Sequence, residues 1–231
     1  PLQLALKKNV EGLFGLVLHN GYGVTECSPN IAQTRIESPR NDVSVGQVLP
    51  DVEIKLVATN GEPVADGEVG ELSVRGPNVM KGYYRNPEET AAVIDSAGWF
   101  NTKDLARVKD GNLYIVGRTK ELILRFGFNV YPAEVEGVLN SHPAVVRSAV
   151  IGRSLRDESG NEEIVAFIQL SEGSTATIAD LKTLSADHLA PYKRPSHFLL
   201  VPTMPLTPTG KVIKEALINI LETSNGKYYS D

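Results

Sequence analysis

The pattern of hydrophobic and polar positions changes character twice along the chain. Leucine and valine recur at roughly helical spacing over residues 1–14, which predicts a helix, and the apolar run at 15–19 predicts a short strand after it. Between residues 43 and 116 short β runs are separated by turn pairs such as Asp110-Gly111. This stretch predicts strands at 52–57, 71–75, 105–109 and 112–116, and one helix at 87–94. Short strands of this kind favour a small barrel or sandwich.

After Arg118 strands and helices mix, which predicts a second, small α+β domain with its boundary near that residue. The expected strands are residues 121–125, 145–151, 164–170 and 198–201, and the expected helices are 132–139, 178–189 and 212–221. The tail at 223–231 is expected to fray.

Composition and charge then narrow the class of protein. The 231 residues are 42% hydrophobic and 22% charged, as in soluble globular proteins, and the net charge of −5 argues against non-specific nucleic-acid binding. No apolar run approaches the ~20 residues of a membrane span. A single cysteine, Cys27, excludes an internal disulfide, so we expect a cytoplasmic location. The chain does not begin with Met, and we expect it to be a piece of a longer one.

Candidate chemistry begins at residues 20–26, where two glycines flank an aromatic residue and a hydroxyl and a carboxylate follow. Glycines let backbone amides approach phosphate. Tyr22 offers a flat face to a base, Thr25 a hydrogen bond to phosphate, and Glu26 an oxygen ligand for Mg²⁺. The segment is neither the Rossmann fingerprint nor a Walker loop. The same residues also fit a plain glycine turn between strands.

Three later segments have the same two interpretations. Asp104, expected at the start of a strand, can accept both hydroxyls of a ribose or cap a turn. The basic residues at 117–125 can line a ligand site or form a solvated linker. The loop at 205–211 holds two prolines and presents Lys211 at its tip, to a ligand or to solvent. The four histidines show no metal-ligand spacing, and we expect Cys27 to be structural.

Taken together and in this order, the motifs resemble the C-terminal motif series of the adenylate-forming superfamily. The matching segments are Gly21–Glu26, Gly70–Gly76 with Gly82–Tyr84, Thr102–Asp104, Gly117–Glu121 and Pro205–Lys211. The superfamily includes acyl-CoA synthetases, aryl-CoA ligases such as 4-coumarate–CoA ligase, luciferases and nonribosomal peptide adenylation domains. The resemblance implies a mixed α/β fold, in which residues 1–117 end a large adenylation domain with a β-barrel-like subdomain. Residues 118–231 would be its small mobile α+β domain.

The resemblance also implies a role for each motif residue in binding ATP or AMP and Mg²⁺. Tyr22 would stack on adenine, Thr25 would contact phosphate, and Glu26 would bind the Mg²⁺. Asp104 would hold the ribose hydroxyls with help from Arg118. The residues implied beside the nucleotide through the first motif are Asn20, Gly21 and Gly23.

In the second domain the resemblance implies a hinge at Lys120. Phe126 and Gly127 match the loop that lines the pantetheine tunnel for coenzyme A, and Asn129 would approach the nucleotide. Lys211 matches the lysine that bridges the carboxylate and the α-phosphate during adenylation.

Two positions depart from the family pattern. The family usually has glycine where Lys103 stands and a small or non-aromatic residue where Phe126 stands, which bears on ribose and coenzyme A binding. The phosphate loop that ends in Pro-Lys-Gly, upstream in the family, has no counterpart in these 231 residues.

The implied function is an ATP-dependent carboxylic acid–CoA ligase, present as a C-terminal fragment. Its partners would be a small carboxylic acid, ATP, coenzyme A and the remaining N-terminal part of the same enzyme, and oligomerisation is left open. Two alternatives stay open: an adenylation domain that loads a carrier protein, and a non-catalytic binding module if the native chain is only this long.

Overall fold

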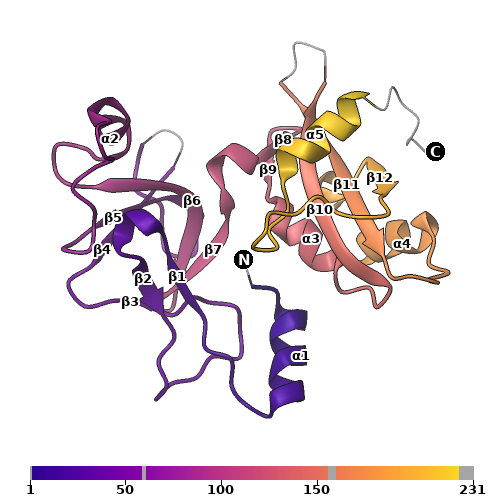
Figure 1. Ribbon diagram of the computed structural model, residues 1–231, viewed down its shortest axis with the longest axis horizontal. Coiled ribbons are helices and arrows are strands. Elements are labelled where there is room, and N and C mark those ends of the chain that lie inside the picture. Colours follow the sequence, from indigo (N-terminus) through magenta and orange to yellow (C-terminus); the bar gives the residue numbers. More distant parts are fainter. Residues whose placement is uncertain (1, 59–60, 156–159, 224–231) are drawn as a thin grey trace. The chain divides into compact units, whose positions relative to one another are not determined.

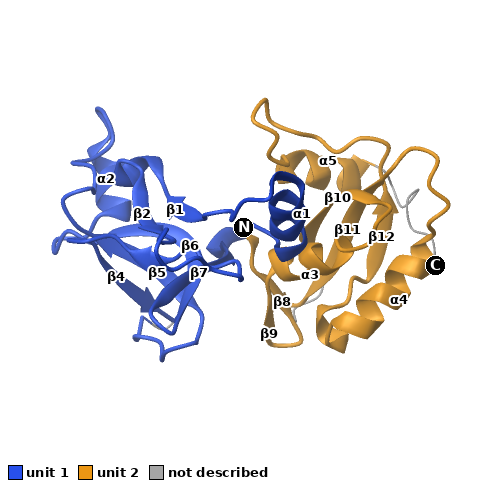
Figure 2. Ribbon diagram, turned by 90° about the horizontal axis from the view of Figure 1, so that it is seen from below, with its two compact units in different colours: residues 1–120 blue, residues 121–231 orange. Residues whose placement is uncertain are grey.

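The chain divides into two compact units, residues 1–120 and 121–231, in a computed structural model that describes residues 2–58, 61–155 and 160–223. Figure 1 labels the helices and strands, and Figure 2 colours the two units separately. The sequence predicts a frayed tail at residues 223–231. Of these, residues 224–231 lie outside the described residues. No helix in the described part of the chain is long and apolar enough to cross a membrane.

Unit 1 begins with helix α1 (Leu4–Phe14) and continues into two antiparallel sheets. The first sheet has the order β1 (Gly21–Gly23), β2 (Asn30–Gln33) and β3 (Gln47–Val48). The second has the order β4 (Glu53–Val57), β5 (Gly70–Arg75), β6 (Phe100–Lys109) and β7 (Asn112–Arg118). Both orders are linear, and an isolated antiparallel bridge between Gly46 and Leu113 joins the two sheets. The pairings of the described residues thus show β-sheets where the sequence predicts a small barrel or sandwich, without showing a closed barrel.

Two short elements complete unit 1. Helix α2 (Pro87–Val93) begins as predicted, with proline in its first turn and the Asn86 side chain accepting a hydrogen bond from the Glu89 amide. The 3₁₀ turn η1 (Thr25–Cys27) follows β1. Cys27 is fully buried, and burial, then the nearby Glu26 charge, raises the pKa of its thiol to about 11. This environment agrees with a structural cysteine.

The strand predicted at residues 15–19 is wrong. This segment has no strand partner in the structure, and the first strand begins two residues after it ends, at Gly21 inside the glycine motif. The backbone of Leu18 is instead bonded to side chains of α1, which satisfies the groups that a sheet would otherwise pair. The apolar residues Leu16 and Val17 are 72% and 50% exposed.

Unit 2 holds a sheet of order β10 (Val145–Ser154), β11 (Glu162–Leu170) and β12 (His197–Leu200), covered by helices on both faces (Figure 2). Its other elements are the turn η2 (Thr119–Glu121), the hairpin β8 (Ile123–Arg125) and β9 (Phe128–Val130), α3 (Pro132–Leu139), α4 (Ile178–His188), the turn η3 (Pro191–Lys193) and α5 (Lys214–Thr223). The turn η2 spans the division between the units.

Alternation along β10 and β11 explains why this sheet is covered on both faces. Val150 and Ile164 belong to a core shared with α3 and α4, while their neighbours Ile151 and Val165 belong to a second core shared with α5. Successive side chains of a strand point to opposite faces, so a strand that is apolar throughout needs a layer on each side.

Candidate functional site

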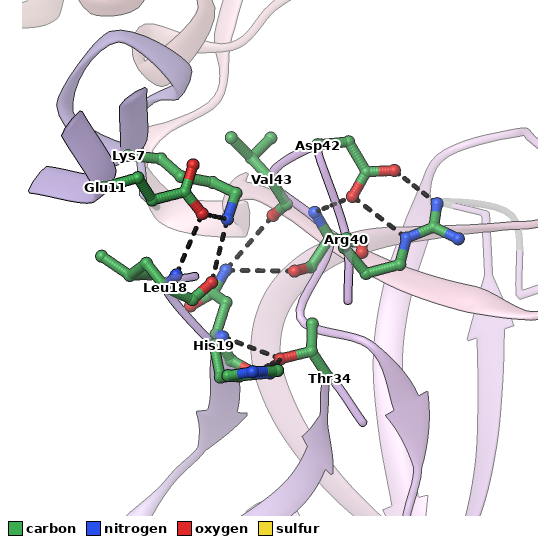
Figure 3. Close-up of polar contacts among 10 residues, drawn as sticks. Lys7, Glu11, Leu18, His19, Thr34, Arg40, Asp42 and Val43 are labelled. Carbon is green, nitrogen blue, oxygen red and sulfur yellow. Dashed lines mark hydrogen bonds and ion pairs between the residues drawn. The ribbon is translucent and has the colours of Figure 1, made fainter. Parts of the chain in front are cut away.

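The segment that leads into the glycine motif is held by an ion pair within α1 (Figure 3). The Lys7 side chain is buried, pairs with Glu11, and donates a hydrogen bond of 2.9 Å to the Leu18 carbonyl. The Glu11 carboxylate accepts one of 2.9 Å from the Leu18 amide. The hydrogen bonds from Lys7 and Leu18 outweigh burial and lower the pKa of Glu11. The two side chains fix the backbone entering the motif.

Asn20, at the start of the motif, is hydrogen-bonded to three residues from other segments of unit 1. Its amide nitrogen donates to the carbonyls of Val43 and Ser44, at 3.3 and 3.2 Å, and its backbone amide donates to the Thr34 hydroxyl at 2.9 Å. The same Thr34 hydroxyl lies 3.3 Å from His19 Nδ1 (Figure 3). The Asn20 side chain therefore organises loops of unit 1.

Gly23 is required by packing. An added Cβ at this position would lie 1.9 Å from the Pro29 carbonyl oxygen, which no side chain can tolerate. At Gly21 the nearest atom, the Ala32 carbonyl oxygen, lies 3.3 Å away, a tight contact. The pairing of β1 with β2 shifts register between Tyr22 and Gly23, and Thr25 is exposed at the turn beyond.

The structure brings Tyr22, Asp104 and Arg118 together from β1, β6 and β7. The Tyr22 hydroxyl donates to Asp104 Oδ2 at 2.5 Å, and Arg118 Nε donates to Oδ1 at 3.3 Å. Asp104 is 6% exposed, whereas the Arg118 side chain is 56% exposed. Burial, and then the bond to the Asp104 carboxylate, raises the pKa of Tyr22 well above its usual range, so the phenol is a neutral donor at every physiological pH.

Asp104 lies inside β6, and its expected place at the start of a strand is wrong. The strand begins four residues earlier, at Phe100, and Asp104 pairs with Arg118 across to β7. The residue before it, Lys103, has a φ of +59°, a left-handed conformation, where the pairing of β5 with β6 is irregular. The neighbouring Thr102 hydroxyl donates to the Leu72 carbonyl and accepts from the Asp104 amide, which holds this segment in place.

Glu26 belongs to a second carboxylate–phenol pair. The Tyr83 hydroxyl donates to its Oε1 at 3.0 Å, and the Met80 amide donates to its backbone carbonyl at 2.7 Å. Burial, and then Glu26, raises the pKa of Tyr83. The described residues contain no cluster of three or more metal-ligating side chains. One carboxylate oxygen together with phosphate oxygens is a normal donor set for Mg²⁺, so Glu26 fits that role.

Glu71 is a polar hub that the sequence analysis did not identify. Its carboxylate accepts hydrogen bonds of 2.5 Å from Asn101 and from Thr119, and lies 3.5 Å from Lys103 Nζ. Burial would raise its pKa, but these partners outweigh burial and lower it. The hub reaches the segment just before Lys120, which is itself exposed in η2. Its members come from β5, β6 and η2, so the contacts among them cannot be inferred from local sequence, although Glu71 lies in the matched segment Gly70–Gly76.

In unit 2, Phe126 and Gly127 form the turn of the β8–β9 hairpin. Both have positive φ, +51° and +78°, as a two-residue hairpin turn requires. Phe126 is 64% exposed, and its amide donates to Asn161 Oδ1 at 2.7 Å. Asn129 is exposed on β9, next to Phe128, whose ring stacks on Tyr192 at 4.5 Å between centroids.

Lys211 ends a closed turn and is exposed. Its backbone amide donates to the Thr207 hydroxyl at 3.0 Å, and its carbonyl accepts from the Thr207 amide at 2.8 Å. Arg147 of β10 donates to the Gly210 carbonyl at 2.7 Å, which anchors the turn to the sheet of unit 2. The backbone of the loop is therefore held in place, while the Lys211 side chain is exposed to solvent.

The predicted site residues thus fall into separate groups. Unit 1 joins Tyr22, Asp104 and Arg118 in one cluster and Glu26 with Tyr83 in another. Phe126, Gly127, Asn129 and Lys211 belong to unit 2.

Comparison with known proteins gives a consistent result along the chain. Residues 1–84 match the model of the AMP-binding enzyme family, and residues 134–211 match that of the AMP-binding enzyme C-terminal domain. The chain is 40% identical over 214 residues to the mitochondrial medium-chain acyl-CoA ligase ACSF2 of Danio rerio, covering 90% of this chain and 34% of that protein. It spans about two fifths of the length of the curated relatives it matches.

Two solved structures share the fold. ATP-bound MatB from Rhodopseudomonas palustris aligns with a TM-score of 0.87 at 32% identity, over 99% of this chain and 44% of that one. The o-succinylbenzoate CoA synthetase MenE from Bacillus subtilis, in complex with its acyl-adenylate intermediate, aligns with a TM-score of 0.83 at 32% identity, over 94% of this chain and 44% of that one. The chain belongs to the adenylate-forming superfamily of AMP-binding enzymes, among acyl-CoA synthetases and 4-coumarate–CoA ligases, and corresponds to the C-terminal portion of the AMP-binding domain plus the C-terminal domain.

Proposed function

We propose that this chain is the C-terminal part of an ATP-dependent carboxylic acid–CoA ligase. In the first step a carboxylate oxygen attacks the α-phosphorus of ATP, which forms an acyl-adenylate and releases pyrophosphate. In the second step the sulfur of the coenzyme A thiolate attacks the acyl carbon, which forms the thioester and releases AMP. The acyl-CoA ligases among its relatives and the ATP and acyl-adenylate bound in its structural neighbours support this assignment.

The observation that carries the proposal is the nearly buried Asp104 carboxylate between Tyr22 and Arg118. Each carboxylate oxygen has two acceptor positions, so one bond to each leaves capacity for two further donors. The 2′- and 3′-hydroxyls of a ribose are such a pair of donors. We assign Asp104 and Arg118 to the ribose and the face of Tyr22 to the adenine, with Gly21 and Gly23 beside it.

The first step requires positive charge near the phosphates, because a carboxylate and a polyphosphate repel each other. Mg²⁺ bound through Glu26 would neutralise charge on the phosphate oxygens. Thr25 is assigned a hydrogen bond to the phosphate. Lys211 would lie between the attacking carboxylate and the α-phosphate, where a preorganised cation stabilises the developing charge.

The second step requires different neighbours around the same acyl carbon. We assign the hairpin turn at Phe126 and Gly127 to the pantetheine arm of coenzyme A, and Asn129 to the nucleotide. Rotation of unit 2 about Lys120 would move Lys211 away from the reacting acyl group and bring the Phe126–Gly127 turn to it. The division of the chain into units at residues 120 and 121 supports a hinge at that place.

The proposal also assigns a partner to α1. Leu13 and Phe14 are 78% and 67% exposed, and Leu16 just beyond is 72% exposed. An apolar surface of this kind marks an interaction site. We assign it to the N-terminal part of the same enzyme.

A thermodynamic cycle tests the ribose assignment. AMP and 2′,3′-dideoxy-AMP are titrated calorimetrically against the wild-type chain and against Asp104→Asn. Loss of hydrogen bonds to a charged group weakens AMP binding by about 10- to 100-fold. The wild type should therefore discriminate between the nucleotides, and Asp104→Asn should bind both equally weakly.

Unit 1 offers a matched control. Asp42 is likewise held by an arginine and a tyrosine, Arg40 and Tyr114, the latter donating at 2.8 Å. Asp42→Asn should leave the discrimination intact. If Asp104→Asn still prefers AMP as strongly as the wild type, the ribose assignment is wrong.

A further inference from the structure

The residues on either side of Lys120 are each tied by a side chain to their own unit. On one side the Thr119 hydroxyl donates to Glu71 Oε2 at 2.5 Å, within unit 1. On the other side Lys214 Nζ lies 2.6 Å from Glu121 Oε2, within unit 2. The Lys120 side chain is exposed and makes no hydrogen bond or ion pair with the described residues.

In unit 1 the hydrogen bond from Thr119 connects to the four-stranded sheet through Glu71. Glu71 lies on β5, opposite Leu105 of β6, and also accepts a hydrogen bond from Asn101. The ladder between β6 and β7 ends at the pair Asp104–Arg118, so regular backbone pairing stops one residue before Thr119. The Thr119–Glu71 bond therefore extends the anchored part of unit 1 to the residue next to Lys120.

In unit 2 the ion pair between Glu121 and Lys214 continues through Glu136 to the buried core. Lys214 Nζ lies 3.3 Å from Glu136 Oε1 as well as near Glu121. The same Glu136 oxygen accepts a hydrogen bond of 2.9 Å from the amide of Val150, which is fully buried on β10. The chain Glu121–Lys214–Glu136 thus links the residue after Lys120 to the central sheet.

Lys214 also connects the hinge region to the lysine assigned to the first reaction step. It opens α5 only three residues after Lys211, and the Ile213 amide between them donates to the Pro205 carbonyl at 2.9 Å. Glu121 is therefore linked within unit 2, through Lys214, to the segment that carries Lys211.

We propose that Glu71 and Lys214 are positioning residues that confine rotation between the units to the backbone of Lys120. This inference rests on the proposed rotation of unit 2. With Thr119 and Glu121 both held, the two soft dihedral angles of Lys120 carry the change. Without either tie, neighbouring residues would share the rotation, and unit 2 would sample a wider range of orientations.

Distance measurements between spin labels test the proposal without any nucleotide. Labels are attached to cysteines introduced at Glu88 of α2 and Lys182 of α4, both exposed, while the native Cys27 is fully buried. The wild-type chain should give one or two narrow distance populations by double electron–electron resonance. Thr119→Val and Lys214→Met should each replace them with a broad distribution.

Conservative and matched variants separate positioning from a general loss of structure. Thr119→Ser and Lys214→Arg keep the donors and should restore narrow populations. Lys193→Met removes a lysine from an ion pair of the same length in the same unit, 2.6 Å to Glu134, a pair that does not include Glu121, and should leave the distribution unchanged.

Either of two results would overturn the proposal: distributions in Thr119→Val and Lys214→Met as narrow as in the wild type, or equal broadening in Lys193→Met. Because the readout uses no nucleotide, its failure is distinct from failure of the ligase assignment, which the AMP cycle tests.

Discussion

The hydroxyl of Tyr22 donates a 2.5 Å hydrogen bond to the carboxylate of Asp104, although the two residues are 82 positions apart in the chain. The bond joins the first strand of one sheet to the third strand of the other. It holds an aromatic face and a nearly buried carboxylate in a fixed relation, which is what simultaneous recognition of a base and its ribose requires.

Tyr22→Phe should make the protein less sensitive to alkaline pH. The folded-state pKa of Tyr22 is raised, so the folded state keeps a proton that the unfolded state loses above about pH 10. The contribution to stability is complete below that pH and declines as pH rises, since the unfolded state then binds fewer protons. The free energy of unfolding, measured in urea at pH 7 to 11, should fall less steeply in Tyr22→Phe.

At neutral pH the same variant should lose about 1.5–3 kcal/mol, the range for a hydrogen bond to a charged group. A variant with the wild-type alkaline slope would show that the folded-state pKa of Tyr22 is not raised. Tyr83→Phe, which removes the phenol paired with Glu26, serves as a comparison for a less buried tyrosine.

Lys103→Gly should stabilise the protein. The left-handed φ of +59° costs a residue with a side chain about 1–2 kcal/mol, and glycine adopts it freely. Glycine loses more chain entropy on folding, and the Lys103 side chain, 57% exposed and 3.5 Å from Glu71, contributes little, so the expected net gain is about 0.5–1 kcal/mol.

Lys109→Gly is the matched control for this substitution. Lys109 lies on the same strand, is exposed, and has no positive φ, so glycine there should destabilise the protein. Chemical unfolding of both variants decides the matter. If Lys103→Gly is destabilised as much as Lys109→Gly, the backbone at Lys103 is not strained.

Local signals in the sequence predicted some elements well. The helix at 132–139 is observed with the predicted bounds, because a proline at its first position and regular apolar spacing define it. The helix at 87–94 ends one residue earlier than predicted, at Val93. In both cases the residues that decide the structure are neighbours in sequence.

Elements defined by distant partners could not be predicted in this way. Strands β2 and β3 were missed because they are only four and two residues long, and β2 becomes a strand by pairing with the Tyr22 motif. Strand β9 was missed because its hairpin turn has Phe126 at a positive φ, where a glycine or asparagine would have signalled a turn.

The same distinction holds for the candidate site. Tyr22, Asp104 and Arg118 were identified as motif residues, but the bonds among them depend on strand order and register. Glu71 and Tyr83 lie in motif segments that were matched without a role for either residue, and Lys214 has no local signal beyond its charge. Only the contacts of these three residues reveal a role.

The two units should unfold separately, because domains that move relative to each other share a modest interface. Calorimetry of the 231-residue chain should resolve two transitions. Trypsin should cut early after Arg118 or Lys120, both exposed, and release fragments that stay folded. A single transition, together with protection of this segment while other sites are cut, would contradict a mobile hinge.

The 231-residue chain should not catalyse adenylation by itself, because its sequence contains no phosphate loop ending in Pro-Lys-Gly. The assay is ATP–pyrophosphate exchange with a panel of carboxylic acids. Robust exchange by this chain would show that the residues present suffice and would overturn the assignment of phosphate binding to a further segment.

The most direct test of the account concerns Lys211. The 231 residues are grafted into MenE of Bacillus subtilis in place of the matching part, with the unmodified graft as control. Adenylation of o-succinylbenzoate and transfer from prepared o-succinylbenzoyl-AMP to coenzyme A are then measured separately with and without Lys211→Ala. We predict that adenylation falls at least ~10²–10³-fold while thioester formation stays near the control rate. An equal fall in both steps would contradict a lysine that acts in one half-reaction only.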